Sequence, residues 1–155
     1  MINIRTFLLV DKNFIPLEEF SGSFRDKYYI DGGITLSIYN TPVLTLEMWD
    51  LVDLLWVNIV DQLEAIALGQ TVVVCFPDCP LQLLFQPIGV NSVNVKTNAK
   101  NSLSAMAPKD MLISCLCSSG WRFFKRMMDL APAHSGIWLA SLDKIEKVSK
   151  SDFWA

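Results

Sequence analysis

The alternation of apolar and polar positions predicts strands in the first forty residues. Three apolar runs are present, at 4–10, 28–30 and 34–39. Asp31, Gly32 and Gly33 separate the last two runs, and an Asp-Gly pair between apolar runs is typical of a tight hairpin turn. We therefore expect three strands, with a hairpin turn at Asp31-Gly32-Gly33 and with Thr41-Pro42 ending the ladder.

Residues 46–68 have the periodicity of an amphipathic helix, with Thr45 as its N-cap and Gly69 just beyond its end. One arc of the helical wheel holds the apolar residues Trp49, Val52, Leu55, Trp56, Ile59, Val60, Leu63 and Ile66. The opposite arc holds four acids and four further apolar residues, Asp50, Asp53, Asp61 and Glu64 with Leu51, Leu54, Val57 and Leu68. We expect Trp49 and Trp56 in the core and the acids in solvent. Because a solvated face needs no leucines, other elements or a partner are expected to cover part of it.

The second half of the chain predicts three more strands and two helices. Apolar segments at 71–76, 81–85 and 92–96 are typical of strands, and nearby prolines favour an edge position or bulged ends for the middle one. A surface loop is expected over 97–107. A helix is expected from 108–110 to Pro132, with a break favoured at 118–120, and a last helix over 138–150. With no repeat and no linker, residues 1–155 are predicted to form a single α+β domain, in which antiparallel sheets pack against a long central helix and further helices follow toward the C-terminus.

Composition and charge exclude several classes of protein. The chain is 52% hydrophobic and 19% charged, which excludes a disordered chain. Its net charge of −3 argues against a nucleic-acid binder. The longest apolar stretch, 44–68, carries five carboxylates, too many for a membrane span, and the apolar run near the N-terminus is too short for a secretory signal. We therefore expect a cytoplasmic protein with no membrane segment and with reduced cysteines.

Motifs that carry catalysis or hold cofactors do not occur in the sequence. The one histidine, His134, is expected in a surface turn, and no nucleophile elbow, phosphate-binding loop or dinucleotide fingerprint is found. The pairs Cys75/Cys79 and Cys115/Cys117 lack the spacing of structural zinc sites and suit buried apolar positions. We predict no catalytic residue, no metal site and no cofactor.

The charges are distributed unevenly along the chain. Residues 32–95 contain no Lys or Arg but six acids: Glu47, Asp50, Asp53, Asp61, Glu64 and Asp78. From Lys96 onward, the chain contains nine basic and five acidic residues. Such asymmetry produces a one-sided negative field that attracts a basic partner. An acidic stripe also keeps an apolar protein in solution, and the sequence leaves both interpretations open.

Two segments carry a resemblance to a known group of proteins. The run Trp-Asp-Leu-Val-Asp-Leu-Leu-Trp at 49–56, followed by Phe-Pro-Asp-Cys-Pro and Leu-Gln-Leu at 76–83, resembles a pattern of small bacterial proteins. Some of these look like immunity proteins of polymorphic or contact-dependent toxin systems, and the similarity covers about residues 29–98. The resemblance implies a non-enzymatic protein that binds and neutralises a cognate toxin domain, for which a nuclease with a basic cleft is one candidate.

The acidic helix face supplies the expected partner-binding residues. They are Asp50, Asp53, Leu54, Val57, Asp61 and Glu64. The carboxylates would steer a basic toxin, and Leu54 and Val57 would form the desolvated centre of the contact. Two alternatives remain: a homo-oligomeric structural or assembly subunit that associates through the apolar residues, and a metal-dependent enzyme that uses the carboxylates on the helix.

Overall fold

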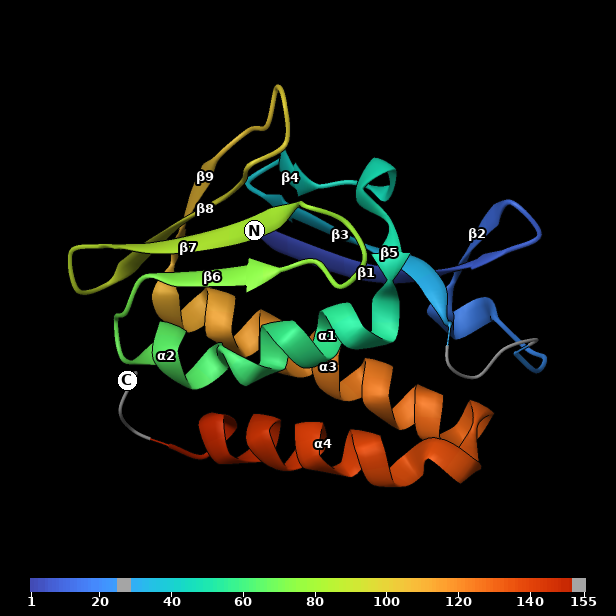
Figure 1. Cartoon of the computed structure of the whole chain (residues 1–155). Coiled ribbons are helices and arrows are strands. Elements are labelled where there is room, and N and C mark those ends of the chain that lie inside the picture. The colour runs from blue at the N-terminus through green and yellow to red at the C-terminus, as the bar shows by residue number, and fades with distance from the viewer. Residues whose placement is uncertain (25–28, 152–155) are drawn as a thin grey trace.

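The computed structural model describes residues 1–24 and 29–151, which form two antiparallel sheets with helices on one side (Figure 1). The helices are α1 (Val52–Asp61), α2 (Leu63–Ala67), α3 (Lys109–Leu130) and α4 (Ser135–Ser149), with 3-10 turns η1 (Leu17–Glu19), η2 (Leu46–Met48) and η3 (Pro132–His134). In Figure 1, α1, α2 and α3 lie beneath the sheets, and α4 packs below them as an outer layer. The chain is α+β, as predicted.

The first sheet has the strand order β2 (Asn13–Pro16), β1 (Ile2–Val10), β3 (Asp31–Ile38) and β4 (Thr41–Leu44), with the short β5 (Asp50–Leu51) also paired to β3. The strand expected at 4–10 is confirmed. The hairpin turn expected at Asp31-Gly32-Gly33 is wrong, because these residues lie inside β3. Residue 28 of the expected strand at 28–30 lies outside the described residues, and Tyr29 and Ile30 are not in a strand.

Close packing explains the glycines of β3. Gly32 lies opposite Leu8 in β1, and a Cβ atom there would sit 2.3 Å from the Phe7 carbonyl oxygen and 2.8 Å from a methyl carbon of Val52. The turn instead lies at Tyr39-Asn40, where both residues have positive φ, 48° and 69°. The chain then returns as β4, so Thr41 begins a strand and does not end the ladder.

The second sheet has the order β6 (Val72–Cys75), β7 (Gln82–Ile88), β8 (Ser92–Thr97) and β9 (Ala105–Pro108). Its first three strands are confirmed, whereas β9 lies in the expected loop. The edge position or bulged ends expected for the middle strand are not found, because β7 lies between β6 and β8 and pairs with each of them without a register shift. The pairing of β6 with β7 ends at Phe85, so at Pro87 only β8 lies beside β7, where Pro87 pairs with Val93. A proline is tolerated there because no strand on the other side requires its missing backbone N–H.

The expected helix over 46–68 begins later than predicted and is broken at Gln62. The Val52 amide donates to the Ile30 carbonyl at 2.9 Å, and Asp31 pairs with Leu51, so β3 holds the backbone of the preceding residues extended. Thr45 precedes only η2 and makes no side-chain cap. Gly69, with φ of 79°, follows the last helical turn as predicted.

The burial predicted for Trp49 is also wrong. Trp49 lies just before β5 and is 47% exposed, whereas Trp56 in α1 is fully buried, as expected. The Trp56 ring stacks on Phe123 with 6.1 Å between centroids. Its indole N–H donates to Thr6 Oγ1 of β1 at 3.0 Å. Trp56 therefore connects α1, α3 and the first sheet.

Helix α3 runs without interruption through 118–120, where a break was favoured. Gly120 is buried, and a Cβ atom there would lie 3.2 Å from Ile145 of α4 and 3.3 Å from the Trp56 ring. The small residue thus allows three helices to approach closely. Pro132 follows the end of α3, and α4 matches the last predicted helix. None of the helices formed by residues 1–24 and 29–151 has the length and apolarity that a membrane crossing requires.

Candidate functional site

The structure divides the six predicted partner-binding residues into two groups. Asp50 and Asp53 are only 4% and 9% exposed, so the expectation that they face solvent is wrong. Leu54 is 39% exposed, Asp61 and Glu64 are exposed, and Val57 is half-buried. Only these four of the six residues are accessible to a partner.

Asp50 joins two backbone segments. Its Oδ1 accepts a hydrogen bond from the Leu51 amide at 2.6 Å, and its Oδ2 accepts one from the Asp78 amide at 3.2 Å. Burial raises the pKa of the neighbouring Asp31 carboxyl, and the charges of Asp50 and Asp78 raise it further. The Asp50 carboxylate therefore ties the start of α1 to the loop after β6, which is a structural role.

Asp53 lies in the first turn of α1 with its carboxyl turned inward. Its Oδ1 is buried and accepts no hydrogen bond from any residue within 1–24 and 29–151. Burial raises the pKa of Asp53, while the backbone amides of Leu54 and Asp53 and the nearby His134 act in the opposite direction. This carboxyl is accordingly more easily protonated than a solvent-exposed one.

The four accessible predicted residues and Leu68 form a line that we call the α1–α2 stripe. It consists of Leu54, Val57, Asp61, Glu64 and Leu68, whose spacing of three or four positions is that of neighbours along one side of a helix. Leu68, just after α2, is 51% exposed. Helices α1 and α2 run along the front of the molecule in Figure 1, between β6 and α4. The stripe has leucines at its ends and carboxylates near its middle.

One cation of α4 reaches the α1–α2 stripe. Lys144 Nζ lies 2.5 Å from Asp61 Oδ1, and both side chains remain about half exposed. Across the α1–β6 boundary, the Asn58 side chain donates to the Cys75 carbonyl oxygen at 2.9 Å. The stripe is therefore attached on one side to α4 and on the other to the edge strand of the second sheet.

The four cysteines and His134 are not among the residues of the α1–α2 stripe. All four cysteines are free thiols: Cys117 is buried as expected, and Cys79 and Cys115 are half-buried. Cys75 is exposed, so the buried position expected for it is wrong. Burial raises the pKa of Cys79 and Cys117, which favours their unreactive thiol form. His134 lies in η3, half-buried, with its ring 6.1 Å from that of Trp138. Within the described part of the chain, no three His, Cys, Asp or Glu side chains come close enough together to hold a metal ion.

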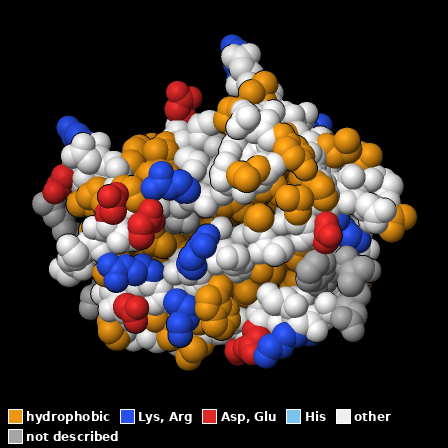
Figure 2. Space-filling view, turned by 180° about the vertical axis from the view of Figure 1, so that it is seen from behind, with side chains coloured by type: hydrophobic (Ala, Val, Ile, Leu, Met, Phe, Trp, Pro, Cys, Tyr) orange, Lys and Arg blue, Asp and Glu red, His pale blue; other side chains and the backbone are white. Residues whose placement is uncertain are grey.

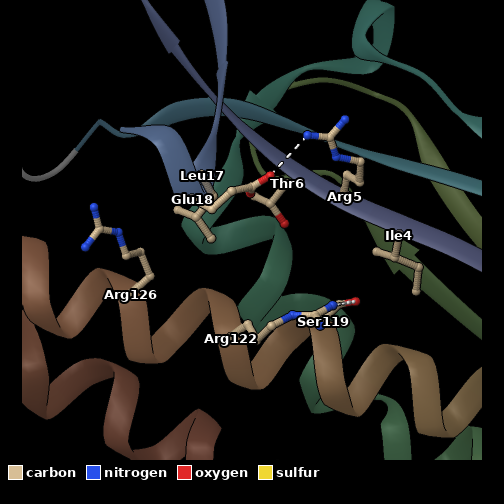
Figure 3. A pocket seen from close by; sticks show the side chains of 8 residues that line it. All are labelled: Ile4, Arg5, Thr6, Leu17, Glu18, Ser119, Arg122 and Arg126. Atoms are coloured by element: carbon tan, nitrogen blue, oxygen red, sulfur yellow. Dashed lines mark hydrogen bonds and ion pairs between the residues drawn. The ribbon is translucent and has the colours of Figure 1, made fainter. Parts of the chain in front are cut away.

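Sequence reasoning missed a cavity of about 450 Å³ between β1, η1 and α3 (Figure 3). Three arginines line it, Arg5 from β1 and Arg122 and Arg126 from α3. The spacing of four between Arg122 and Arg126 places both on one side of a helix, a signal that the sequence did contain. Nothing in the sequence links them to Arg5. Seen from behind, basic side chains gather on one half of the molecule, with a few acids among them and an apolar patch beside them (Figure 2).

Comparisons of the chain with protein-family models, with curated proteins and with solved structures find no match. The α1–α2 stripe and the arginine-lined cavity are therefore the two features from which a function can be inferred.

Proposed function

We propose that this chain is a non-enzymatic immunity-type protein that binds and neutralises a cognate toxin domain in the cytoplasm, with the α1–α2 stripe as its docking surface. The observation that carries the proposal is the composition of this stripe. Two exposed leucines, Leu54 and Leu68, lie on one exposed line with the carboxylates of Asp61 and Glu64. Apolar residues that exclude water, accompanied by charges, are the usual components of a protein interface.

Charge favours a basic partner for this surface. The segment that forms α1, α2 and the strands β3 to β7 has no Lys or Arg, and Lys144 is the cation that pairs with the stripe. A toxin that acts on nucleic acid needs a basic cleft, because its substrate is a polyanion. The field of the stripe would steer such a cleft toward it, and a contact of ordinary size would bury about 800 Å² on each partner.

The buried acids support this surface without touching the partner. Asp50 fixes the backbone that leads into α1, and Asp53 fills the inner side of its first turn. A docking helix whose start is held by tertiary hydrogen bonds loses little conformational entropy on binding.

Self-association through the same stripe is less well supported. In a two-fold symmetric dimer the same surface meets itself, so Asp61 and Glu64 would lie near their own copies. The metal-dependent enzyme is also less well supported, because Asp50 and Asp53 point inward while Asp61 and Glu64 point outward. A basic protein domain satisfies the charges of the stripe better than either alternative.

The proposal predicts that a gene for a toxin domain lies beside the gene for this chain, and it is tested with the domain found there. Co-expression should restore growth, and titration calorimetry should show a complex. Glu64→Lys and Leu54→Ser should each weaken binding by about tenfold or more, because one reverses a steering charge and the other removes desolvated contact area. Asp129→Lys, which reverses an exposed charge on α3, is the matched control and should leave the affinity within about twofold. Failure to form a complex, or equal losses in all three variants, would refute the proposal.

A further inference from the structure

The arginine-lined cavity has walls from distant parts of the chain. In Figure 3, Arg5, Thr6 and Glu18 extend from β1 and η1 on one side, and Arg122 and Ser119 lie on α3 on the other. Its volume of about 450 Å³ falls within the range of small-molecule sites, roughly 300–1,000 Å³. The cavity is thus large enough for a small organic molecule.

The charges around the cavity are not balanced. Glu18 is the one carboxylate among the lining residues, and its Oε1 pairs with Arg5 Nη2 at 3.1 Å. Its own backbone amide and the charges of Arg5 and Arg122 lower the pKa of Glu18, so it is ionised and already engaged. Arg122 and Arg126, one helical turn apart on α3, add two further positive charges. The lining residues therefore leave an excess of positive charge facing a concave space.

Hydrogen-bond donors in the cavity remain available for a ligand. Arg122 donates to Ser119 Oγ at 3.3 Å, a long contact that uses one of its several N–H groups. Arg126 donates to the Phe20 carbonyl oxygen through Nη2, while its buried Nε makes no hydrogen bond to any described residue. Because this Nε atom has almost no accessible surface, the donors left for a ligand are the remaining N–H groups of the two guanidinium ends.

A hydroxyl group on the β1 wall adds a further donor. Thr6 Oγ1 accepts the indole N–H of Trp56 at 3.0 Å, so its own hydrogen is not used in that bond. Ile4 and Leu17 supply apolar lining beside these polar groups. The cavity thus combines guanidinium groups and a hydroxyl with an apolar wall.

We propose that this cavity binds a small organic oxyanion, a phosphate monoester or a carboxylate attached to a short apolar group. Guanidinium groups bind both kinds of oxyanion through paired N–H donors, and the apolar residues would contact the rest of the molecule. The site lies on α3 and β1, away from the α1–α2 stripe, so it is independent of the proposed docking to a toxin.

Calorimetric titration of the full chain with three probes tests the proposal. Phenyl phosphate and benzoate present the two oxyanions on the same apolar ring, and benzyl alcohol presents the ring without a charge. At least one anion should bind with saturation, and benzyl alcohol should bind at least about tenfold more weakly, because it cannot pair with the arginines. Preference for phenyl phosphate or for benzoate identifies which oxyanion the cavity selects.

Arg122→Gln should weaken binding of the preferred anion by about tenfold or more. Arg122 is exposed, so its loss should leave the fold intact. Lys125→Gln is the matched control, because it removes an equal charge from the same helix at an exposed lysine beside Trp121, outside the cavity lining. The control should keep its affinity within about twofold, because Lys125 does not line the cavity and its exposed charge is screened by solvent and salt.

The NMR resonance of the Trp56 indole N–H reports where the anion binds, since this group contacts Thr6 on the cavity wall. Its signal should shift on titration in the wild type and shift less in Arg122→Gln. The proposal would be overturned if neither anion saturated the protein at concentrations up to roughly 10 mM, which is well above the Kd expected of a specific site. Equal losses in Arg122→Gln and Lys125→Gln, or binding that leaves the Trp56 signal unmoved, would overturn it as well.

Discussion

The two sides of the segment 50–68 contain the same residue types and use them differently. Asp50 and Asp53 on the inner side are buried, and Asp50 accepts hydrogen bonds from backbone amides. On the outer side, Asp61 is exposed and pairs with a lysine, and Leu54 lies in solvent. The comparison shows that a carboxylate on an amphipathic segment can be structural or accessible, and that the polarity of the residue does not decide which.

Hydrogen bonding explains how the inner side can contain an acid at all. Asp50 replaces the water that it loses with two backbone donors, whereas Asp53 Oδ1 has no such replacement within the described residues. The inner acids should therefore affect stability in opposite directions when they are changed. The outer residues should affect binding and leave stability nearly unchanged.

The largest effect is expected at the centre of the inner side. Trp56→Ala should lower the free energy of unfolding by about 3–5 kcal/mol, because it leaves a cavity against Phe123 and removes the hydrogen bond to Thr6. Urea unfolding followed by circular dichroism measures this change. Trp49→Ala is the paired control on a half-exposed ring and should cost less than Trp56→Ala, because less of its apolar area is buried. If the two substitutions lowered the free energy of unfolding equally, the assignment of Trp56 but not Trp49 to the core would be wrong.

A smaller loss is expected at the start of α1. Asp50→Ala should lower the free energy of unfolding by about 1–3 kcal/mol, because the amides of Leu51 and Asp78 lose their acceptor. Glu64→Ala removes an exposed carboxylate from the outer side and should change stability by less than about 0.5 kcal/mol. Both are measured by the same urea unfolding. If Asp50→Ala proved as mild as Glu64→Ala, the structural role of Asp50 would be wrong.

The difference in the free energy of unfolding between Asp53→Asn and the wild type should depend on pH. The folded-state pKa of Asp53 lies above its ordinary value of 3.8, so the unfolded chain ionises first as pH rises. The contribution of Asp53 to stability therefore falls as pH increases from 3.8 through the folded-state pKa. Asn carries no charge at any pH, so the free energy of unfolding of the variant should rise relative to that of the wild type over this interval. The difference should persist at neutral pH.

Urea unfolding of both proteins at several values between about pH 4 and pH 7 measures this difference. Asp61→Asn is the control, because it makes the same substitution at an exposed carboxylate. A constant difference between wild type and Asp53→Asn across the series would show that Asp53 ionises as freely as a carboxylate in solvent.

The smallest effect is expected at the ion pair of the outer side. Asp61→Asn should change the free energy of unfolding by less than about 1 kcal/mol, because the side chains of Asp61 and Lys144 both remain about half exposed. Added salt should reduce even this difference, since it screens exposed charges. Unfolding at two salt concentrations measures it, and a larger loss that salt does not alter would place Asp61 with the structural acids.

Local patterns predicted most elements of the fold correctly. The strand at 4–10, three strands of the second sheet, α3 and α4 all follow from short-range periodicity and from proline positions. The prediction failed where distant segments compete for the backbone. A turn is predicted at Gly32 and Gly33, but Gly32 allows β1 and Val52 to approach β3, and Gly33 lies against Leu46. The pairing of Leu51 with Asp31 delays the start of α1. Sequence windows do not contain these contacts.

The sequence predicted, in part, one of the two candidate surfaces. Leu54, Asp61 and Glu64 are accessible as expected, since each lies opposite the buried arc of the helix. The arginine-lined cavity was not predicted, because Arg5 and Arg122 belong to elements far apart in the chain. The helical spacing of Arg122 and Arg126 indicates a shared side of α3, but it does not show what lies opposite that side.

The sequence by itself determined the α+β class, the positions of most helices and strands, and the unequal distribution of charge, because these depend on the order of residues along the chain. Only the tertiary structure decided which carboxylates are buried and which arginines meet across a cavity. Burial and encounter depend on what packs against a residue, and the neighbours of Asp50 and Arg5 come from other parts of the chain.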